Sequence, residues 1–472
     1  MTSRCKNNPI HLYNSIHLSF ITSSKQELVK VSIPVGFTEE RTYAISVILG
    51  HFLGLEFEVL IDETINHYKF DCCTGQIKMT DAFFGMFDTD YLSKENIPQS
   101  SYSSQNQYSN RFEVLFGSEA ISKTGNHITC ETDLVASTFF MLSRWEEYCI
   151  PKKDEHGRTV ERELFSVKHN LHHRPLVNEW VELLWNMLQE AGCSQNRKQY
   201  KFDIRITHDV DHIARYDSLK KFIRALGGDL FLRKNPVLML NTLKDFFAIR
   251  FGSKKDNYDT TDWLMDVSER YNTKSHFYFI PSAKGENDAR YDISSPRIKE
   301  IITNIESRDH IVGIHPSYNT FKNPGQFKDE VERIQKVAKT IKEGRQHYLR
   351  FSNPETWNMW NDAQLTHDST IGFALDIGFR AGVCYDYPVF DVIQRKQLNL
   401  IERPLIIMEG PLVNTFGGGE SSMKAAQNVI DQCKKFNGEF VFLWHPENFN
   451  HTLWKPHVWL YESIIQYALN VK

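Results

Sequence analysis

Short apolar runs alternate with amphipathic windows throughout the chain beyond residue 200, and this alternation constrains the fold most strongly. The runs have the length of buried strands, and the windows at 298–305 and 330–342 have the periodicity of helices. Such alternation is typical of βαβ units and a parallel sheet or barrel. We therefore expect an α/β fold with strands near residues 202–206, 275–280, 311–314, 380–383 and 440–444.

The first 200 residues differ in character and predict a separate α/β domain. Helices are expected over 133–149 and 177–191, and the serine-rich stretch 99–107 is typical of an exposed loop. Gly192 and a polar run end the second helix and indicate a domain boundary. We expect an N-terminal accessory domain with a scaffold or docking role over residues 1–197 and a catalytic domain over residues 198–472.

Composition excludes several classes of protein. Hydrophobic residues make up 41% of the 472 residues, enough for sizeable cores, and the net charge of −4 gives no basic footprint for nucleic acid. The eight cysteines lack C-x-x-C spacing, so neither a zinc ribbon nor a disulfide scaffold is indicated. We expect no transmembrane segment, because no apolar run approaches the roughly 18–20 residues that a spanning helix needs. We expect a cytoplasmic location, because residues 1–24 also lack the continuous apolar core of a signal peptide.

Ionisable side chains follow three of the expected strands at the point where each strand ends. Asp209 and Asp211 follow the first strand, His315 follows a later one, and His445 follows the last. The carboxyl ends of parallel strands meet at one edge of a sheet, where sites are built. Two carboxylates on one face of an extended chain repel unless a cation neutralises one. This favours one aspartate on a metal and the other as a base, against the alternative of a helix cap with a surface acidic pair.

The order of these motifs resembles the polysaccharide deacetylases, the NodB-type or carbohydrate esterase family 4 enzymes. The stretches T-H-D-x-D, H-P-S-Y, an arginine-containing segment, D-S-T with G-F-R-A-G, and L-W-H occur in that order over about residues 200–450. The resemblance implies a distorted (β/α) barrel for the C-terminal domain. The preceding part resembles the extra domain of a bacterial subgroup of this superfamily.

The resemblance also implies a divalent metal, with zinc as the preferred ion. Its ligands are expected to be Asp211, His315 and Asn319. The family has a second histidine where this chain has Asn319. An amide oxygen is a poor zinc ligand, so this departure leaves the identity and retention of the metal open.

The remaining roles are carried over in the same way. Asp209 matches the family's base, and Arg350 is the expected arginine that holds it, with Arg345 as the alternative. His445 matches the general acid. The residues expected to contact substrate are Tyr318 and Trp444.

The function implied by the resemblance is metal-dependent hydrolysis of an N-acetyl group on a carbohydrate, either a polysaccharide or a glycan precursor. A hydrolase of a non-sugar C–N bond and a metal-poor, degenerate sugar-binding module remain as alternatives. The expected partner is a carbohydrate that bears an N-acetyl group. The basic segment 220–250 is rich in Leu and Phe. A solvated helical insertion is favoured there over a lid or a membrane-surface contact.

Overall fold

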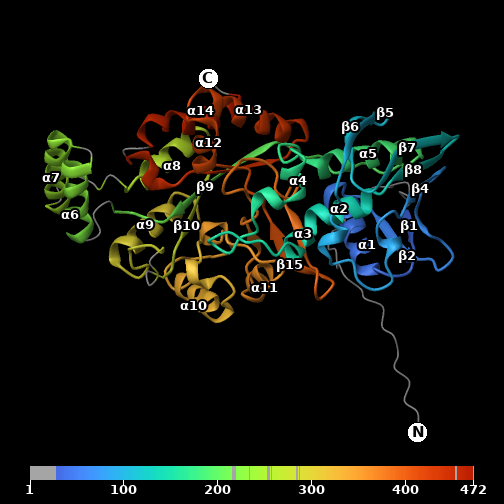
Figure 1. The fold of residues 1–472 in the computed structure, drawn as a ribbon, viewed down its shortest axis with the longest axis horizontal. Coiled ribbons are helices and arrows are strands. Elements are labelled where there is room, and N and C mark those ends of the chain that lie inside the picture. Colours follow the sequence, from blue (N-terminus) through green and yellow to red (C-terminus); the bar gives the residue numbers. More distant parts are fainter. Residues whose placement is uncertain are drawn as a thin grey trace, which may run out of the picture.

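The structure is a computed structural model that describes residues 28–214, 219–232, 234–251, 256, 258–282, 285, 287–451 and 454–470. Residues 1–24, on which the expected location partly depends, lie outside this range. Within it, no helix combines the length and the apolar character needed to cross a bilayer. Figure 1 shows two sheet-containing regions side by side, with α6 and α7 projecting from one end of the molecule.

The N-terminal region contains a six-stranded sheet in the order β2-β1-β3-β4-β8-β7 and a separate β5–β6 hairpin. Helix α5 contacts β4 and β6, and α2 contacts both α5 and α1. Its strands are β1 (Val29–Ile33), β2 (Phe57–Ile61), β3 (His67–Asp71), β4 (Gln76–Thr80), β5 (Tyr102–Asn106), β6 (Ser109–Val114), β7 (Gly117–Thr124) and β8 (His127–Thr132). Its helices are α1 (Thr38–Ile45), η1 (Ser46–Phe52), η2 (Phe84–Met86), η3 (Lys94–Asn96), α2 (Leu134–Ser143), α3 (Trp145–Cys149), η4 (Glu161–Glu163), α4 (Phe165–Lys168) and α5 (Leu176–Glu190).

The C-terminal region is built on a nine-stranded sheet in the order β14-β15-β13-β12-β11-β10-β9-β17-β16. Every neighbouring pair is parallel except β14–β15. Its strands are β9 (Asp203–Val210), β10 (Ser275–Phe279), β11 (Ile311–Ile314), β12 (Glu343–Gly344), β13 (His367–Asp368), β14 (Tyr387–Asp391), β15 (Lys396–Glu402), β16 (Ile407–Met408) and β17 (Glu439–Leu443).

Helices connect β9 to β10, β10 to β11, β11 to β12, β12 to β13 and β16 to β17, as βαβ units require. The longer ones are α6 (Leu219–Gly227), α7 (Pro236–Arg250), α8 (Thr261–Arg270), α9 (Pro296–Ser307), α10 (Pro324–Ile334), α11 (Glu355–Asp362), α12 (Glu409–Phe416), α13 (Glu420–Lys435) and α14 (Trp459–Leu469). The short ones are η5 (Gly228–Leu232), η6 (Tyr318–Thr320), η7 (His347–Leu349), η8 (Pro446–Phe449) and η9 (Lys455–His457).

The expected α/β architecture is confirmed, but the sheet is open rather than a closed barrel. Strands β14 and β16 are its edges, and no ladder joins them within the described part of the chain. The chain itself crosses from β15 to β16. There the Leu405 N–H donates to the Ile371 carbonyl at 2.9 Å, and the Ile406 N–H donates to the Val441 carbonyl at 3.1 Å.

Three local expectations were wrong. The helical window expected at 330–342 extends past α10, which ends at Ile334 and is followed by turns. Residues 380–383 form a buried turn rather than a strand, because Gly382 has a φ of +63° and Arg380 is held by ion pairs. The stretch 99–107 contains β5, a polar strand paired only with β6. In addition, the helix expected over 133–149 is divided into α2 and α3 at Arg144, whose φ is 54°.

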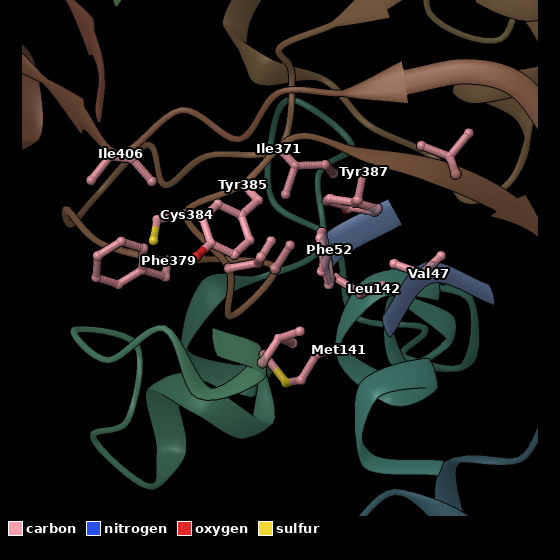
Figure 2. Close-up of a cluster of buried hydrophobic side chains, with 14 of the residues drawn as sticks. Val47, Phe52, Met141, Leu142, Ile371, Phe379, Cys384, Tyr385, Tyr387 and Ile406 are labelled. Carbon is pink, nitrogen blue, oxygen red and sulfur yellow. The ribbon is translucent and has the colours of Figure 1, made fainter. Parts of the chain in front are cut away.

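The two regions share one hydrophobic core. Figure 2 shows Val47, Phe52 and Met141 of the N-terminal region facing Phe379 and Tyr387 of the C-terminal region. The sheets are therefore separate, while the apolar packing between them is continuous. The boundary at residues 197/198 stays a prediction.

Candidate active site

Adjacent parallel strands bring the candidate site together at one edge of the sheet. Strands β17, β9, β10, β11 and β12 are neighbours, so the residues at their carboxyl ends lie next to one another. Asp209 lies near the end of β9, His315 directly follows β11, and His445 follows β17. Strand β12 can lie this close to β11 because a Cβ on Gly344 would be 1.8 Å from the Ile314 carbonyl oxygen.

Asp211, His315 and His347 form a group that could hold a metal ion. One ligand atom from each lies within 4.8 Å of the other two. The Asp211 Oδ1 atom is 3.4 Å from His315 Nε2 and 3.6 Å from His347 Nδ1. That oxygen is buried and accepts no hydrogen bond from the residues that the structure describes. Burial raises the pKa of Asp211.

The hydrogen bonds of the two histidines fix which ring nitrogens carry protons. His315 Nδ1 is 2.6 Å from the Arg345 carbonyl oxygen, and His347 Nε2 is 2.9 Å from that of Asn287. A carbonyl oxygen only accepts, so both nitrogens are donors, and the lone pairs lie on His315 Nε2 and His347 Nδ1. These two atoms face each other at 2.8 Å. Burial lowers the pKa of each imidazole to about 4, so two neutral rings oppose their lone pairs across a position suited to a cation.

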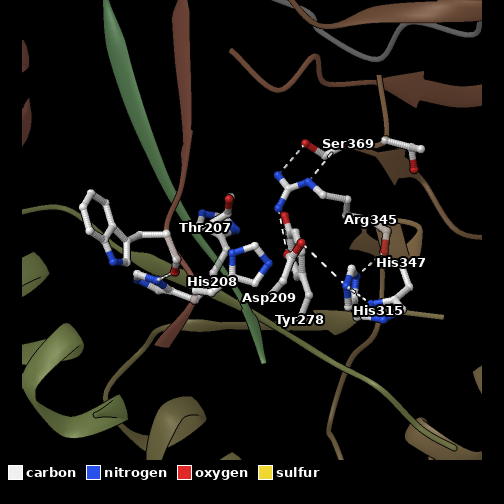
Figure 3. Close-up of polar contacts among 12 residues, drawn as sticks. Thr207, His208, Asp209, Tyr278, His315, Arg345, His347 and Ser369 are labelled. Carbon is white, nitrogen blue, oxygen red and sulfur yellow. Dashed lines mark hydrogen bonds and ion pairs between the residues drawn. The ribbon is translucent and has the colours of Figure 1, made fainter. Parts of the chain in front are cut away.

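Asp209 is held by an arginine that also binds the neighbouring strand end (Figure 3). Arg345 Nη1 donates to Asp209 Oδ1 at 2.8 Å, while its Nε and Nη2 donate to the carbonyl and hydroxyl oxygens of Ser369. Burial alone would raise the pKa of Asp209, but the Arg345 guanidinium lowers it below its ordinary value. The carboxylate is therefore ionised and fixed in direction, as a general base requires.

His445 has a buried carboxylate behind it. Its Nδ1 is 2.6 Å from Glu409 Oε1, and its Nε2 lies 3.8 Å from Asp211 Oδ2. Burial by itself would lower the pKa of His445, but Glu409 raises it well above the ordinary value. The site thus pairs an anionic base with a cationic acid, the arrangement that divides acid and base roles between two residues.

Both regions of the chain contribute to one cavity of about 310 Å³, which is lined by the two aspartates and three histidines described above. The turn at 154–158 of the N-terminal region supplies His156 and Arg158. Arg158 is fixed by hydrogen bonds to Asp154 and to the Tyr348 carbonyl oxygen. The N-terminal region therefore forms part of the cavity wall. The lining residues are His156, Arg158, Asp209, Asp211, His315, His347, Tyr348, Leu349, Ala374, Met408 and His445.

Several residues expected at the site lie elsewhere. Asn319 is exposed and does not line the cavity, so the structure places His347, and not Asn319, beside Asp211 and His315. Arg350 does not contact Asp209. Its guanidinium donates to the carbonyl oxygens of His156 and Tyr318, and Arg345 is the partner of Asp209.

The two expected substrate contacts also need correction or refinement. Trp444 directly follows β17 and is fully buried, with its ring packed against Phe442, Phe449 and Tyr461. Tyr318 lies beside the cavity without lining it, and its hydroxyl is 3.1 Å from His156 Nδ1.

His347 and Glu409 were missed from the sequence. His347 follows β12 as His315 follows β11, but β12 has only two residues and no recognisable apolar run. Glu409 follows the two-residue strand β16 and begins α12 in the same way. The rule that ionisable residues follow strands would have found both if these short strands had been recognised.

A second group with metal-like spacing, His172, His173 and Asp376, joins the two regions. There His172 Nε2 lies 3.0 Å from Asp376 Oδ2, so a direct hydrogen bond accounts for this arrangement.

Comparison with known proteins finds one family model and several structural neighbours. A model described as a family of unknown function (DUF7033) matches residues 30–192. No curated protein matches the sequence. Structural neighbours include a protein assigned as a polysaccharide deacetylase from Mycobacterium smegmatis, with 12% identity, coverage of 58% of this chain and 85% of that chain, and a TM-score of 0.35. A chitin deacetylase from Colletotrichum lindemuthianum has 10% identity, coverage of 58% and 91%, and a TM-score of 0.26. At these TM-scores the neighbours carry no argument about function, which rests on the geometry of the site.

Proposed function

We propose that the chain is a metal-dependent hydrolase that removes an N-acetyl group from a carbohydrate. One observation carries the proposal: the lone pairs of His315 Nε2 and His347 Nδ1 converge beside the unpartnered Asp211 Oδ1. Two imidazoles and one carboxylate are a common ligand set for catalytic zinc and related divalent ions. When bound, such an ion supplies an acidified water and polarises an amide carbonyl.

The remaining groups have complementary roles. Asp209, kept ionised by Arg345, accepts the proton of the attacking water. His445, kept protonated by Glu409, donates a proton to the departing nitrogen. An amide needs both steps, because an amine leaves readily only when its nitrogen is protonated.

The cavity suits a sugar-sized group. Its volume of about 310 Å³ lies at the lower end of the usual range for small-molecule sites. Tyr348, which is 39% exposed, provides an aromatic surface in the cavity, and Arg158, which donates a hydrogen bond to the Tyr348 carbonyl oxygen, provides a polar group beside it.

Acetate release from a panel of N-acetylhexosamines and their conjugates tests the proposal. Asp209→Asn is expected to lower kcat by at least about a hundredfold while metal content stays unchanged. Asp203→Asn, at the exposed start of the same strand, is the matched control and is expected to keep full activity. Near-full activity of Asp209→Asn would overturn the role of this residue. Cleavage of other amides without acetate release from sugars would favour a non-sugar C–N hydrolase.

Metal content tests the ligand set separately. Elemental analysis of the purified protein is expected to give one divalent ion per chain for the wild type and for Asn319→Ala. The His347→Ala variant is expected to lose the ion. A wild-type protein that binds no divalent ion, even when it is supplied, would favour the degenerate binding module.

A further inference from the structure

A helical hairpin projects from the body of the molecule after β9. It consists of α6, η5 and α7, and Figure 1 shows it at the end of the molecule remote from the N-terminal sheet. The two helices pack on each other, with the Phe222 and Phe246 rings stacked at 3.8 Å. The hairpin therefore has a small internal core of its own.

The outer surface of this hairpin is unusually apolar. Three consecutive side chains in η5 are exposed, with Leu230 at 41%, Phe231 at 74% and Leu232 at 86%. Single exposed apolar residues are ordinary, but a contiguous cluster marks an interaction surface. Further exposed apolar side chains on the helices are Leu219, Ile223, Val237, Leu240, Phe247 and Phe251.

The same segment is strongly basic. Residues 219–251 contain seven Lys or Arg and two Asp, which gives a charge of +5 within a chain of net charge −4. One of these acids, Asp229, is buried and accepts a hydrogen bond from Thr242 at 2.7 Å. Basic side chains on the exposed surface include Arg224, Lys234, Lys244 and Arg250.

We propose that this hairpin binds the surface of an anionic lipid bilayer. Exposed Leu and Phe next to Lys and Arg are the composition of segments that lie in the bilayer interface, where apolar rings enter the acyl boundary and cations remain at the headgroups. A second copy of the chain fits less well, because two hairpins of charge +5 would repel each other. The inference concerns an interaction surface and does not depend on the proposed hydrolase activity.

Flotation of the full-length protein with lipid vesicles tests the inference. The protein is expected to float with vesicles of phosphatidylcholine mixed with phosphatidylglycerol, and to do so less in high salt. It is expected to bind phosphatidylcholine vesicles weakly. Failure to float with the anionic vesicles, or equal binding to both kinds, would overturn the proposal.

Paired variants locate the binding surface. Phe231→Ser with Leu232→Ser is expected to lower the partition coefficient by about a hundredfold or more, since each side chain loses its apolar insertion. Lys234→Ala with Lys244→Ala is expected to lower it roughly twenty-five-fold, at about fivefold for each cation. Met86→Ser, which removes a side chain of 66% exposure elsewhere, is the control and should not change binding.

The oligomeric state distinguishes bilayer binding from self-association of the hairpin. Sedimentation velocity without lipid is expected to give the same species for the wild type and for the Phe231→Ser, Leu232→Ser variant. A concentration-dependent dimer that only the wild type forms would assign the hairpin to self-association and overturn the bilayer proposal. Circular dichroism of each variant confirms that a loss of binding does not come from unfolding.

Discussion

We expect loss of the Glu147 carboxylate to lower the stability of the protein substantially. Its buried carboxylate lies between two arginines: Arg380 Nη2 is 2.5 Å from Oε2, and Arg144 Nε is 3.0 Å from Oε1. Arg380 belongs to the C-terminal region and Arg144 to the N-terminal region, so this ion pair joins the two. Burial opposes ionisation of Glu147, but the two guanidinium groups lower its pKa to about 2.

The contribution of Glu147 to the free energy of unfolding follows from this pKa. A fall from 4.5 to about 2 corresponds to about 3 kcal/mol of stability at pH values above both. Glu147→Gln keeps the shape but removes the carboxylate that pairs with Arg380 and one of the two carboxylates that pair with Arg144, the other being Glu146. Breaking such a buried pair usually costs about 3–5 kcal/mol. We therefore expect the variant to lose about 3 kcal/mol in urea unfolding near pH 7.

The pH dependence has a definite sign. The folded-state pKa is depressed, so the contribution is present above about pH 4.5 and is lost as the pH falls toward about 2. Near pH 3.5 the gap between wild type and variant is expected to narrow to about 2 kcal/mol. Glu163→Gln is the matched control: its pKa is also lowered to about 2, but it lies on the surface, so little change is expected. Equal stability of Glu147→Gln and wild type, or a gap that does not narrow in acid, would refute this reasoning.

Three further predictions concern activity. Arg345→Met is expected to lower kcat by about a hundredfold, because Asp209 loses its hydrogen-bond partner. Arg350→Met is the control and is expected to leave kcat near the wild-type value. Equal kcat values for the two variants in steady-state kinetics would contradict this prediction. Glu409→Gln is expected to lower the pKa of the acid it supports, so the basic limb of the kcat–pH profile moves to lower pH, and an unmoved limb would count against that role. Arg158→Ala is expected to raise KM by about tenfold with little change in kcat, and a fall in kcat alone would indicate a different function.

The sequence predicted those parts of the fold that depend on strong local patterns. Strands β9, β10, β11 and β17 have four to eight residues and lie within mostly apolar runs, so they could be recognised from the sequence. Strands β12, β13 and β16 have two residues each, too few for any periodicity. Whether the sheet is open or closed could not be predicted either. It depends on how β14 and β15 pair at the edge and not on a local sequence pattern.

The site was predictable to the same extent. Asp209, Asp211, His315 and His445 follow recognisable strands, and the structure brings them into one cavity. The choice between two arginines five residues apart could not be made from spacing. It depends on the direction in which each side chain leaves its turn. The burial of Trp444 similarly reflects its tertiary neighbours, which the motif around it does not reveal.

In the proposed function, the turn that carries His156 and Arg158 would separate the chemistry from the choice of substrate. The proposed acid, base and metal ligands follow or end strands of the nine-stranded sheet, whereas this turn comes from residues 154–158. Such a turn can change in length or sequence without altering any strand. Relatives that keep the same strand ends could therefore acquire new substrates through this turn alone, and grafting it between them would exchange specificity while preserving the catalytic groups.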